Sequence, residues 1–538
     1  MSNPLQHPCD EEFIRSTKAE ASCARKAGPW VLAATILGSS MAFIDETTVT
    51  VALPAVQSDL GATAVGAQWV VEAYTLLLAA LVLVGGSLGD HLGRLRGFAS
   101  GVVLFTLASV WCGLAPDPGQ LIAARAVQGV GAALLVPNSL AIIGASFDEE
   151  RRGKAIGTWA GFTGLTMILG PVLGGYLAEN VSWRGVFFIN VPLAVAVLTI
   201  TTLRVPESRD EEARGLDLPG AALAAVGLGG LVFGLLESSR VGLGEPVVVG
   251  ALITGVVAVV AFVLVERRVG EPMVPLSLFR VRNFAGANVF TLLLYFALSG
   301  TLFFLPFDLI QAQGYSATAA GAAVAPVVVI MFLLSRYTGS LADRFGPRLP
   351  LVMGPLVSAA GFVLFAVPGL GASYWITFFP AAVVLGVGLA ILVPAVTTVA
   401  LNSVEVRHSG LASAINNSFS QIAGLLAIAA LGVIMFASFG ASLDDRLADL
   451  NLPSDVRQQL EGEKLALGAA EAPENLDAGS QSAVERAIDE AFVSGYRVIM
   501  LVAAASALAS ALGAALLIDG RKEPEEQPDE SEAKVLAA

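Results

Sequence analysis

Residues 86–96 read GSLGDHLGRLR, and residues 339–348 read GSLADRFGPR. The two stretches share the pattern Gly-Ser-Leu-small-Asp-x-x-Gly, and each one joins two long apolar runs. A polar turn that recurs between apolar runs indicates that the chain repeats one structural unit. The repeat pairs the apolar runs before residue 203 with those after residue 284.

Fourteen apolar runs follow one another along the chain, and these two stretches are among the turns between them. A helix that crosses a bilayer needs about 20 predominantly apolar residues. Since 55% of the 538 residues are hydrophobic, the chain contains enough apolar sequence for all of these spans. We therefore predict an all-α integral membrane protein with 14 transmembrane helices. The runs cover residues 30–55, 67–88, 97–115, 119–143, 154–178, 185–203, 219–237, 247–266, 284–310, 318–338, 349–368, 374–400, 410–438 and 491–518.

The overall composition excludes several classes of protein. Only 14% of the residues are charged and the mean hydropathy is +0.73, whereas soluble chains are about 25% charged. A soluble enzyme and a disordered chain are therefore excluded. The net charge of −14 leaves no basic footprint for nucleic acid. Three scattered cysteines and three scattered histidines form neither a disulfide framework nor a metal-binding pattern.

Basic residues are spread unevenly over the predicted loops. With the N-terminus in the cytoplasm, the loops on that side hold 22 basic residues and the loops on the other side hold six. Cytoplasmic loops typically carry the excess of Lys and Arg, so we expect both termini inside and residues 439–490 outside. Residues 1–29 lack the short apolar stretch of a secretory signal, and we expect them to remain as a polar segment.

The repeat and the polar segments together predict the organisation of the chain. Two six-helix bundles are related by the repeat, and two helices are inserted between them. We expect residues 439–490 to form a solvated lid or spacer, with a helix-capping box at Ser482–Glu485 before the last span. The predicted parts are an N-terminal segment 1–29, a bundle 30–203, a linker 204–218, two inserted helices 219–266, a bundle 284–518 that contains the external loop 439–490, and a tail 519–538.

Five motifs together resemble one family, the fourteen-helix drug:proton antiporters of the major facilitator superfamily. The resemblance covers about residues 30–520. Thr50 and Thr166 depart from the usual residues of two of these motifs, Asn and Gly respectively. The motifs are FIDETTVTVALP at 43–54; Gly86, Asp90, Gly93 and Arg94 in the first repeated turn; Arg125, Gln128 and Gly129; Gly157, Gly170, Pro171, Gly174 and Gly175; and WRGVFFINVP at 183–192.

The resemblance implies a proton-coupled antiporter that exports amphipathic small molecules, cations among them, by alternating access. It implies a monomer in a bacterial inner membrane, with a small-molecule substrate, protons and the lipid bilayer as its partners, no nucleic acid, and the proton motive force in place of a cofactor. Two alternatives remain. One is a dedicated exporter of an endogenous metabolite, an antibiotic or a lipid, and the other is a receptor or scaffold that transports nothing. The sequence contains no Walker A motif for ATP-driven transport.

Asp45 is the first candidate for proton coupling. It lies ten residues from the outer end of its run, which is about 15 Å at the helical rise per residue. An ionised carboxylate at that depth is costly unless it is paired or solvated, so Asp45 is either a proton carrier or a structural group bonded to a neighbouring helix. Glu46 points about 100° away and is a second or auxiliary acid.

Arg125 is the candidate partner of Asp45. It lies six residues inside its run, about 9 Å deep, and a long side chain bridges the remaining difference in depth if the two helices are neighbours, as the resemblance implies. Because Arg stays charged, it would favour ionised Asp45 in one state and release it in another. The alternative is an arginine that binds backbone carbonyls.

Acidic and aromatic residues of other runs are the candidates for substrate binding. Asp308 lies two residues after Pro306 in FFLPFDLIQ, in the run that the repeat pairs with the first. It either attracts a cationic substrate or is solvated near the outer mouth. Trp69, Tyr74 and Phe307 are candidates for an apolar pocket, although such residues also pack against lipid or other helices. Glu72 is expected to be solvated near the outer end of its run.

The repeated turns and one glycine-rich run are the candidates for gating. Asp90 and Asp343 are expected in tight turns, where each would meet an arginine or a helix N-terminus and hold one conformation. Arg94 and Arg336 are the candidate partners. Gly93 belongs to the same motif, and Gly170 and Pro171 would let helices approach closely and bend. The alternatives are simple turn formation and packing.

Overall fold

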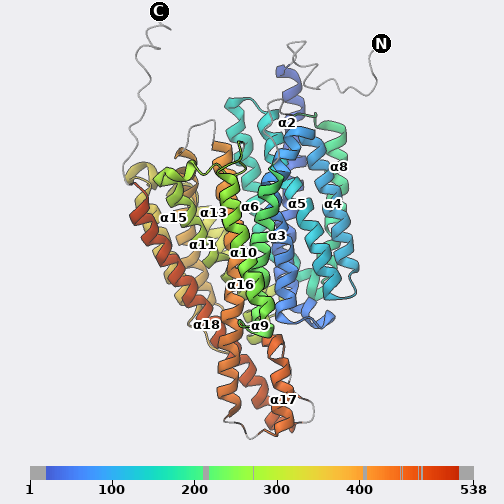
Figure 1. Cartoon of the computed structure of the whole chain (residues 1–538), viewed down its shortest axis with the longest axis vertical. Helices are drawn as coiled ribbons and strands as arrows, with labels where there is room; N and C mark the ends of the chain where they lie inside the picture. Colours follow the sequence, from blue (N-terminus) through green and yellow to red (C-terminus); the bar gives the residue numbers. More distant parts are fainter. Residues whose placement is uncertain are drawn as a thin grey trace, which may run out of the picture.

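The computed structural model describes residues 20–209, 217–270, 272–403, 409–448, 450, 452–470, 472–473 and 476–519. This part of the chain is helical and contains no strand. Fourteen helices are long and apolar enough to cross a membrane, which confirms the predicted fold class. They run side by side, and the first and last described residues, Glu20 and Asp519, lie at the same end of the bundle (Figure 1). We call this the terminal end.

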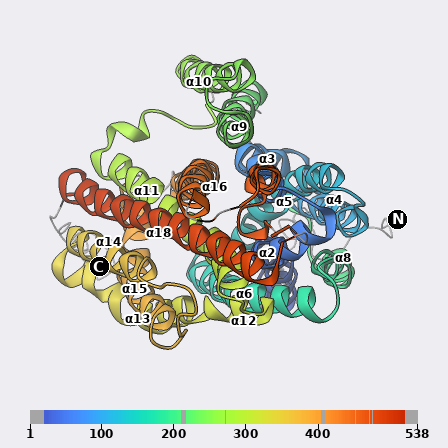
Figure 2. The same ribbon diagram turned by 90° about the horizontal axis from the view of Figure 1, so that it is seen from below.

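Seven helices form the first group, and most of them pack directly against α2. The polar side chains of Asp59, Trp183 and Arg184 hold α2 to the turn before α7 (Trp183 Nε1 to Asp59 Oδ2, 2.9 Å; Arg184 Nη1 to Asp59 Oδ2, 2.6 Å). In Figure 2 the group lies on the side of the bundle where α4 and α8 are outermost. Its members are α2 (Glu20–Leu60), α3 (Ala64–Leu92), α4 (Arg94–Leu114), α5 (Pro118–Ser146), α6 (Glu149–Asn180), α7 (Gly185–Phe188) and α8 (Asn190–Arg204).

The second group begins after a short 3-10 turn, η1 (Leu278–Arg280). Its first long helix ends in a π-helical turn, and its second is interrupted at Val324, so each appears in two pieces. Figure 2 shows this group on the opposite side of the bundle from α4 and α8. Its members are α11 (Arg282–Phe307), η2 (Asp308–Ala312), α12 (Ala317–Ala323), α13 (Ala325–Phe345), α14 (Arg348–Phe365), α15 (Phe378–Asn402), α16 (Ser409–Ala448) and α18 (Ala478–Leu517).

Two further helices, α9 (Leu218–Val241) and α10 (Pro246–Glu266), form a hairpin at the edge of the bundle. The hairpin packs on α3 of the first group and α16 of the second through α9 (Figure 2). The ring of Trp69 on α3 lies 6.1 Å from that of Phe233 on α9. Only 17% of an apolar 18-residue stretch of α10 is buried, so the outer face of this helix is available to lipid.

A helical lobe projects from the end of the bundle opposite the terminal end (Figure 1). We call this end the lobe end. The lobe consists of the last turns of α16, helix α17 (Ser454–Glu463), the 3-10 segment η4 (Lys464–Ala469) and the first turns of α18. Ion pairs between Arg446 and Glu490, and between Lys464 and Asp444 (2.6 Å), hold it together.

The lobe differs from the sequence prediction in two respects. Helices α16 and α18 continue well beyond their apolar runs, because the lobe buries one face of each extension: Leu443, Val484 and Ile488 join the main hydrophobic core. The cap of α18 is Asp477 and not the predicted box at Ser482, which lies inside the helix. Asp477 accepts from the amides of Gly479 (3.0 Å) and Ser480 (3.1 Å), and the hydroxyl and amide of Ser480 lower the pKa of Asp477.

The two groups touch each other closely at the lobe end. Helix α6 crosses α12 there: a Cβ atom on Gly175 would overlap the Ala317 carbonyl, and one on Gly321 would overlap the Pro171 carbonyl. Thr318 donates to Glu179 at the same crossing, at 2.5 Å. Of the predicted polar segments, residues 1–19, 210–216 and 520–538 lie outside the described residues.

Candidate functional site

Asp45 lies in the middle of α2 and is completely buried within the first group of helices. Its Oδ2 atom is paired with Nη1 of Arg125, which α5 brings against it. Its Oδ1 atom accepts hydrogen bonds from Gln128 Nε2 at 2.8 Å and from Asn190 Nδ2 at 3.0 Å. The carboxylate therefore has a charged partner on one oxygen and two amide donors on the other, as a buried charge requires.

Arg125 is also completely buried, and three further groups contact it. Its Nε atom donates to the Val70 carbonyl at 2.9 Å, and Nη1 donates to Gln128 Oε1 at 2.8 Å. The guanidinium lies 4.3 Å above the centre of the Tyr74 ring, a cation–π contact. Its Nη2 atom has no partner among the described residues. Arg125 thus contacts both Asp45 and a backbone carbonyl, the two kinds of partner that the sequence analysis considered.

Gln128, Asn190 and Ser109 complete this polar cluster, and none of them was selected as a site residue from the sequence. Ser109 on α4 accepts from Gln128 at 2.8 Å and from Asn190 at 3.2 Å, and all three side chains are completely buried. Gln128 and Asn190 belong to the motifs quoted above, and this membership is the feature of the sequence that could have identified them as site residues. Ser109 lies in no motif, and only packing brings it here. We call Asp45, Ser109, Arg125, Gln128 and Asn190 the carboxylate cluster.

Glu46, the second predicted coupling residue, lies on a different face of α2 from Asp45. It is half-buried, and its backbone carbonyl accepts from the Thr50 hydroxyl at 3.0 Å. Successive helical residues point about 100° apart, so Glu46 does not share the face of Asp45.

The four residues predicted to bind substrate lie in three different places. Asp308 and Phe307 are together where α11 turns into η2, Tyr74 lies under Arg125, and Trp69 packs on α9. Asp308 is only 1% exposed, and its Oδ1 atom has no partner among the described residues. The side chain is therefore closed off from solvent in this conformation.

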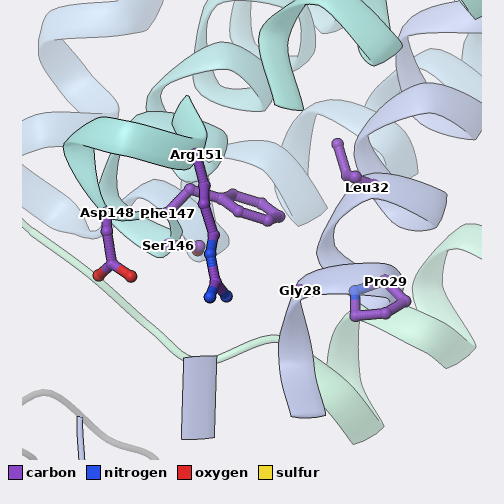
Figure 3. A pocket seen from close by; sticks show the side chains of 7 residues that line it. All are labelled: Gly28, Pro29, Leu32, Ser146, Phe147, Asp148 and Arg151. Atoms are coloured by element: carbon purple, nitrogen blue, oxygen red, sulfur yellow. The ribbon is translucent and has the colours of Figure 1, made fainter. Parts of the chain in front are cut away.

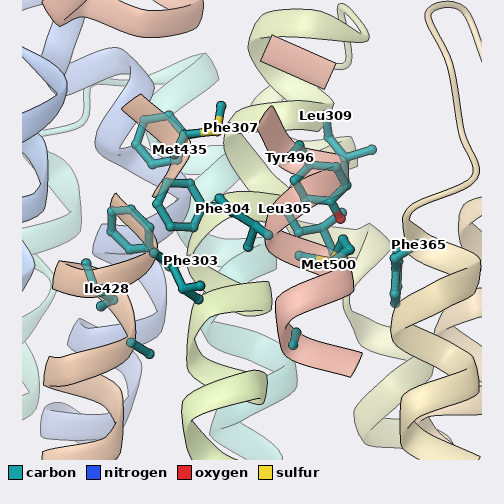
Figure 4. Packing of buried hydrophobic residues seen from close by; sticks show 14 of the residues in the cluster. Phe303, Phe304, Leu305, Phe307, Leu309, Phe365, Ile428, Met435, Tyr496 and Met500 are labelled. Carbon is teal, nitrogen blue, oxygen red and sulfur yellow. The ribbon is translucent and has the colours of Figure 1, made fainter. Parts of the chain in front are cut away.

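Aromatic and sulfur-containing side chains fill the space around the end of α11. Phe303 lies between Phe304 (ring centres 4.9 Å apart) and Phe307 (5.4 Å). Figure 4 shows these rings between α16, which carries Met435, and α18, which carries Tyr496. The Tyr496 hydroxyl, like Asp308 Oδ1, is buried and has no partner in the described structure. Two unsatisfied polar groups thus lie within an apolar and aromatic environment.

Glu72 corrects a sequence-based expectation. We expected it to be solvated, but its side chain is completely buried and both carboxylate oxygens lack a partner within the described residues. The reason is tertiary: α9 and α16 cover the face of α3 that carries it. The hydropathy of one helix does not reveal which other helices pack against each of its faces.

The predicted gating residues of the first repeated turn contact one another. Asp90 lies in the last turn of α3 and not in the turn itself, and it accepts from Arg94 Nε at 2.7 Å. Gly93 joins the two helices with φ of 112°, which favours glycine. A Cβ atom there would also lie 2.9 Å from the Glu207 carboxylate, which caps α4 by accepting from the Leu95 amide at 2.9 Å. The side chains of Asp343 and Arg336 lie outside the described residues.

Gly170 and Pro171 lie inside α6, where that helix approaches α2 on one face and α12 on another. A Cβ atom on Gly170 would overlap the Thr47 hydroxyl, and one on Gly174 would lie 2.6 Å from Thr48 Cα. The Pro171 carbonyl contacts Gly321 of α12. These residues therefore let α6 pack closely against both groups of helices.

One surface hollow of about 290 Å³ lies away from all of these residues. Figure 3 shows Phe147 and Arg151 on one side of it and Leu32, Gly28 and Pro29 on the other. It lies within the first group of helices, between the beginning of the α2 span and the connection from α5 to α6. None of the predicted site residues lines it.

Comparisons with known proteins agree with one another. The sequence model of the Major Facilitator Superfamily matches residues 35–428. The tetracenomycin C resistance and export protein of Streptomyces glaucescens is 33% identical over 93% of this chain and 94% of its own length. The puromycin resistance protein of Streptomyces alboniger is 36% identical, over 80% and 87% of the two chains. The multidrug resistance protein Stp of Mycobacterium tuberculosis is 32% identical, over 88% and 89%.

Two solved structures show the same fold. A bacterial homolog of the human lysosomal transporter Spinster, in an inward-facing and unoccupied conformation, superposes with a TM-score of 0.65 and 17% identity, over 92% of this chain and 98% of that one. The POT family transporter PepTSo gives a TM-score of 0.60 and 13% identity, over 91% of this chain and 97% of that one. Because the sequence identities are this low, the similarity to these two structures shows a shared fold alone.

Proposed function

This chain belongs to the Major Facilitator Superfamily of membrane transporters, and from that premise we propose that it exports amphipathic small molecules, cations among them, in exchange for protons. It is a transporter and not an enzyme. The proposal of drug export draws on the names of its relatives, several of which are antibiotic or multidrug resistance proteins. Proton coupling and substrate class rest on the residues described above.

The observation that carries the proposal is the buried pair of Asp45 and Arg125. A carboxylate in the interior of a membrane protein is costly when ionised and unpaired, but here Arg125, Gln128 and Asn190 stabilise it. Protonation of Asp45 neutralises it and weakens its attraction for Arg125, so that α2 and α5 are no longer held by an ion pair. Proton binding is thereby linked to a change in helix packing.

Alternating access needs two groups of helices that separate at one end and then at the other. The close contacts of α6 with α12 and the hydrogen bond between Thr318 and Glu179 all lie at the lobe end. The release of substrate at that end requires these contacts to break. In the proposed cycle, protonation of Asp45 and the loss of its ion pair bias the choice between the two arrangements.

The region around Asp308 and Phe307 is the proposed binding site for the cationic part of a substrate. Aromatic faces attract cations, and Asp308 adds a carboxyl group, one oxygen of which has no partner among the described residues, next to the aromatic cluster of the second group. Since Asp308 is buried in this conformation, a substrate would meet it only after the lobe end or the terminal end opens.

Transport into proteoliposomes with an imposed pH gradient tests the proposed function. Purified wild-type protein and Asp45→Asn are compared across a panel of neutral, monocationic and anionic amphipathic compounds. We expect accumulation that depends on the gradient with wild type only, since the amide keeps the shape of Asp45 and carries no proton. Equal gradient-driven rates for both proteins contradict the role of Asp45, and transport that ignores the gradient contradicts proton antiport.

We also propose a bacterial inner membrane as the location, with both termini in the cytoplasm and the lobe outside. The uneven distribution of basic residues supports this orientation. Single cysteines at Ser454 in the lobe and at Ser531 in the tail, labelled on intact cells with an impermeant reagent, test it. We expect labelling at Ser454→Cys alone, and labelling at Ser531→Cys alone contradicts the orientation.

A second candidate function is the export of one particular antibiotic or endogenous metabolite. It is favoured by relatives from Streptomyces that are named for resistance to a single compound, tetracenomycin C or puromycin. The same compound panel separates the two candidates: a dedicated exporter moves one structural class and a multidrug exporter moves several.

A further inference from the structure

Glu72 is a buried acid that the proposed function does not use. The side chain is 0% exposed, and both of its oxygens lack a hydrogen-bond partner within the described residues. Buried polar groups are nearly always hydrogen-bonded in folded proteins. A carboxyl group left without any partner therefore needs an explanation beyond the stability of this one conformation.

The neighbours of Glu72 place it where three helices meet. One turn before it on α3, Gln68 contacts α16, since a Cβ atom on Gly432 would overlap the Gln68 amide. One turn after it, Leu76 lies 3.5 Å from a Cβ position on Gly229 of α9. Residues four apart share a helix face, so Glu72 faces the seam between α9 and α16.

Apart from the Gln68 amide, the side chains that pack at this seam form a hydrophobic cluster. Its members come from all three helices, α3, α9 and α16. An ionised carboxylate in such surroundings is strongly disfavoured, so this conformation favours the protonated form of Glu72. The cluster consists of Val65, Ala79, Leu228, Val232, Leu236, Leu425 and Ala429, with Trp69, Leu76, Leu235 and Ile422 packed against it.

The described cations on the elements that pack against α3 have acidic partners elsewhere, and so none of them is placed to neutralise Glu72. Glu46 on α2 and Asp445 on α16 are acids and would not favour its ionised form. The ion pairs are Arg125 with Asp45, Arg94 with Asp90, Arg96 with Glu207, Arg240 with Glu237, Arg446 with Glu490 and Lys464 with Asp444.

The position of the seam explains what the acid can do. Helix α3 belongs to the first group of helices and α16 to the second, so the seam lies between parts that must move relative to each other during alternating access. Glu72 is eight residues from the start of α3 at the lobe end, about 12 Å along the helix. Separation of α3 from α16 at that end would admit water to the carboxyl group.

We propose that Glu72 is a second proton-exchange site, which binds a proton when the seam between α3 and α16 is open at the lobe end and carries it in the closed conformation seen here. This inference rests on the proposed proton antiport. The step is the gain or loss of one proton between the Glu72 carboxylate and water, with no other bond formed or broken. Two exchanging acids, Asp45 and Glu72, then couple two protons to each transported substrate.

The first test observes the proton itself and needs no substrate. Infrared spectra of the purified protein in lipid contain the carbonyl stretch of protonated carboxylic acids, and titration changes the intensity of that band for groups that exchange. We expect a pH-dependent component in wild type and in Glu237→Gln, a control at the end of α9, and its loss in Glu72→Gln. A spectrum of Glu72→Gln identical to wild type at every pH overturns the proposal.

The second test measures the coupling ratio in proteoliposomes with the membrane potential clamped. For one exported substrate, we expect the steady substrate gradient in Glu72→Gln to fall to the square root of the wild-type gradient, because one proton is coupled where two were before. An unchanged gradient overturns the proposal. Glu72→Leu, which suits the apolar seam, is the second variant for both tests if the amide does not fold.

These two tests distinguish failure of the proposed function from failure of the proposed Glu72 site. If wild type shows no transport driven by a pH gradient, proton antiport is contradicted, while the infrared comparison still decides whether Glu72 exchanges a proton. If wild type transports and the infrared component of Glu72 is absent, only the second proton site is contradicted.

Discussion

Gln57 of α2 and Gln311 of η2 join the two groups of helices through one hydrogen bond, in which Gln311 Nε2 donates to Gln57 Oε1 at 3.2 Å. Gln57 also donates through Nε2 to the Ala466 carbonyl of η4 at 3.1 Å. A Cβ atom placed on Gly468, two residues after Ala466, would lie 2.8 Å from Gln311 Oε1, so the backbone of η4 passes close to Gln311. One side chain therefore ties the first group, the second group and the lobe together at the end that must open.

Replacing Gln57 by alanine should loosen the lobe end. The substitution removes two hydrogen bonds, each worth about 0.5–1.5 kcal/mol, that exist in the closed arrangement. Hydrogen exchange followed by mass spectrometry should show faster exchange of the η4 amides. The matched control is Ser58→Ala, because the Ser58 hydroxyl donates to the Ala55 carbonyl within the same helix. Unchanged exchange in Gln57→Ala would show that the apolar packing of η4 alone holds it in place.

Arg125→Lys should abolish gradient-driven transport although the charge is kept. An ammonium group cannot reproduce the guanidinium geometry that contacts Asp45, Gln128 and the Val70 carbonyl at once. Efflux in proteoliposomes measures the effect. Arg184→Lys, at the surface pair with Asp59, serves as the control and should retain transport. Wild-type rates in Arg125→Lys would reduce the role of Arg125 to that of a point charge.

Asn190→Ala should destabilise the carboxylate cluster. It removes the bonds from Asn190 to Asp45 and Ser109, and hydrogen bonds to charged groups contribute about 1.5–3 kcal/mol. We expect a lower Tm for the purified protein and a lower transport rate. The comparison is Asn180→Ala, whose amide bonds only to Tyr176 within the same helix. Equal Tm values for the two variants would count against a structural role for Asn190.

Gly175→Ala should hinder closure of the lobe end. The new Cβ atom would overlap the Ala317 carbonyl at the crossing of α6 with α12, although alanine favours a helix by about 1 kcal/mol over glycine. Gly164→Ala in the same helix meets nothing within 4 Å and is the control. We expect slower efflux in the first variant only. Similar rates in both would mean that the crossing relaxes without cost to the cycle.

Asp308→Asn should weaken the transport of monovalent cations and leave neutral substrates nearly unchanged. Two unit charges 4 Å apart interact by about 4 kcal/mol at an effective dielectric constant of about 20. If half of that remains after desolvation, the affinity changes more than tenfold. Apparent affinities for matched cationic and neutral compounds measure the difference. An equal loss for both classes would indicate a structural role, and no loss for either would place Asp308 outside the substrate path.

Sequence alone predicted the features that depend on properties local to each run. The number of spans follows from hydropathy, because an apolar stretch of sufficient length has no better environment than the bilayer. The depths of Asp45 and Arg125 follow from the helical rise, which is the same in every helix. The place of Asn190 in a quoted motif also lay within reach of sequence, although its bond to Asp45 did not.

Tertiary structure decided which side chains meet. Ser109 joins the carboxylate cluster because α4 packs beside α5 and α8, and nothing in its own run indicates this. Trp69, Tyr74 and Phe307 looked alike as aromatic candidates but lie in three different environments. Glu72 shows the physical reason most clearly. Whether a carboxyl group on a helix faces water or an apolar seam depends on which helices cover that face, and such contacts form between residues far apart in the sequence.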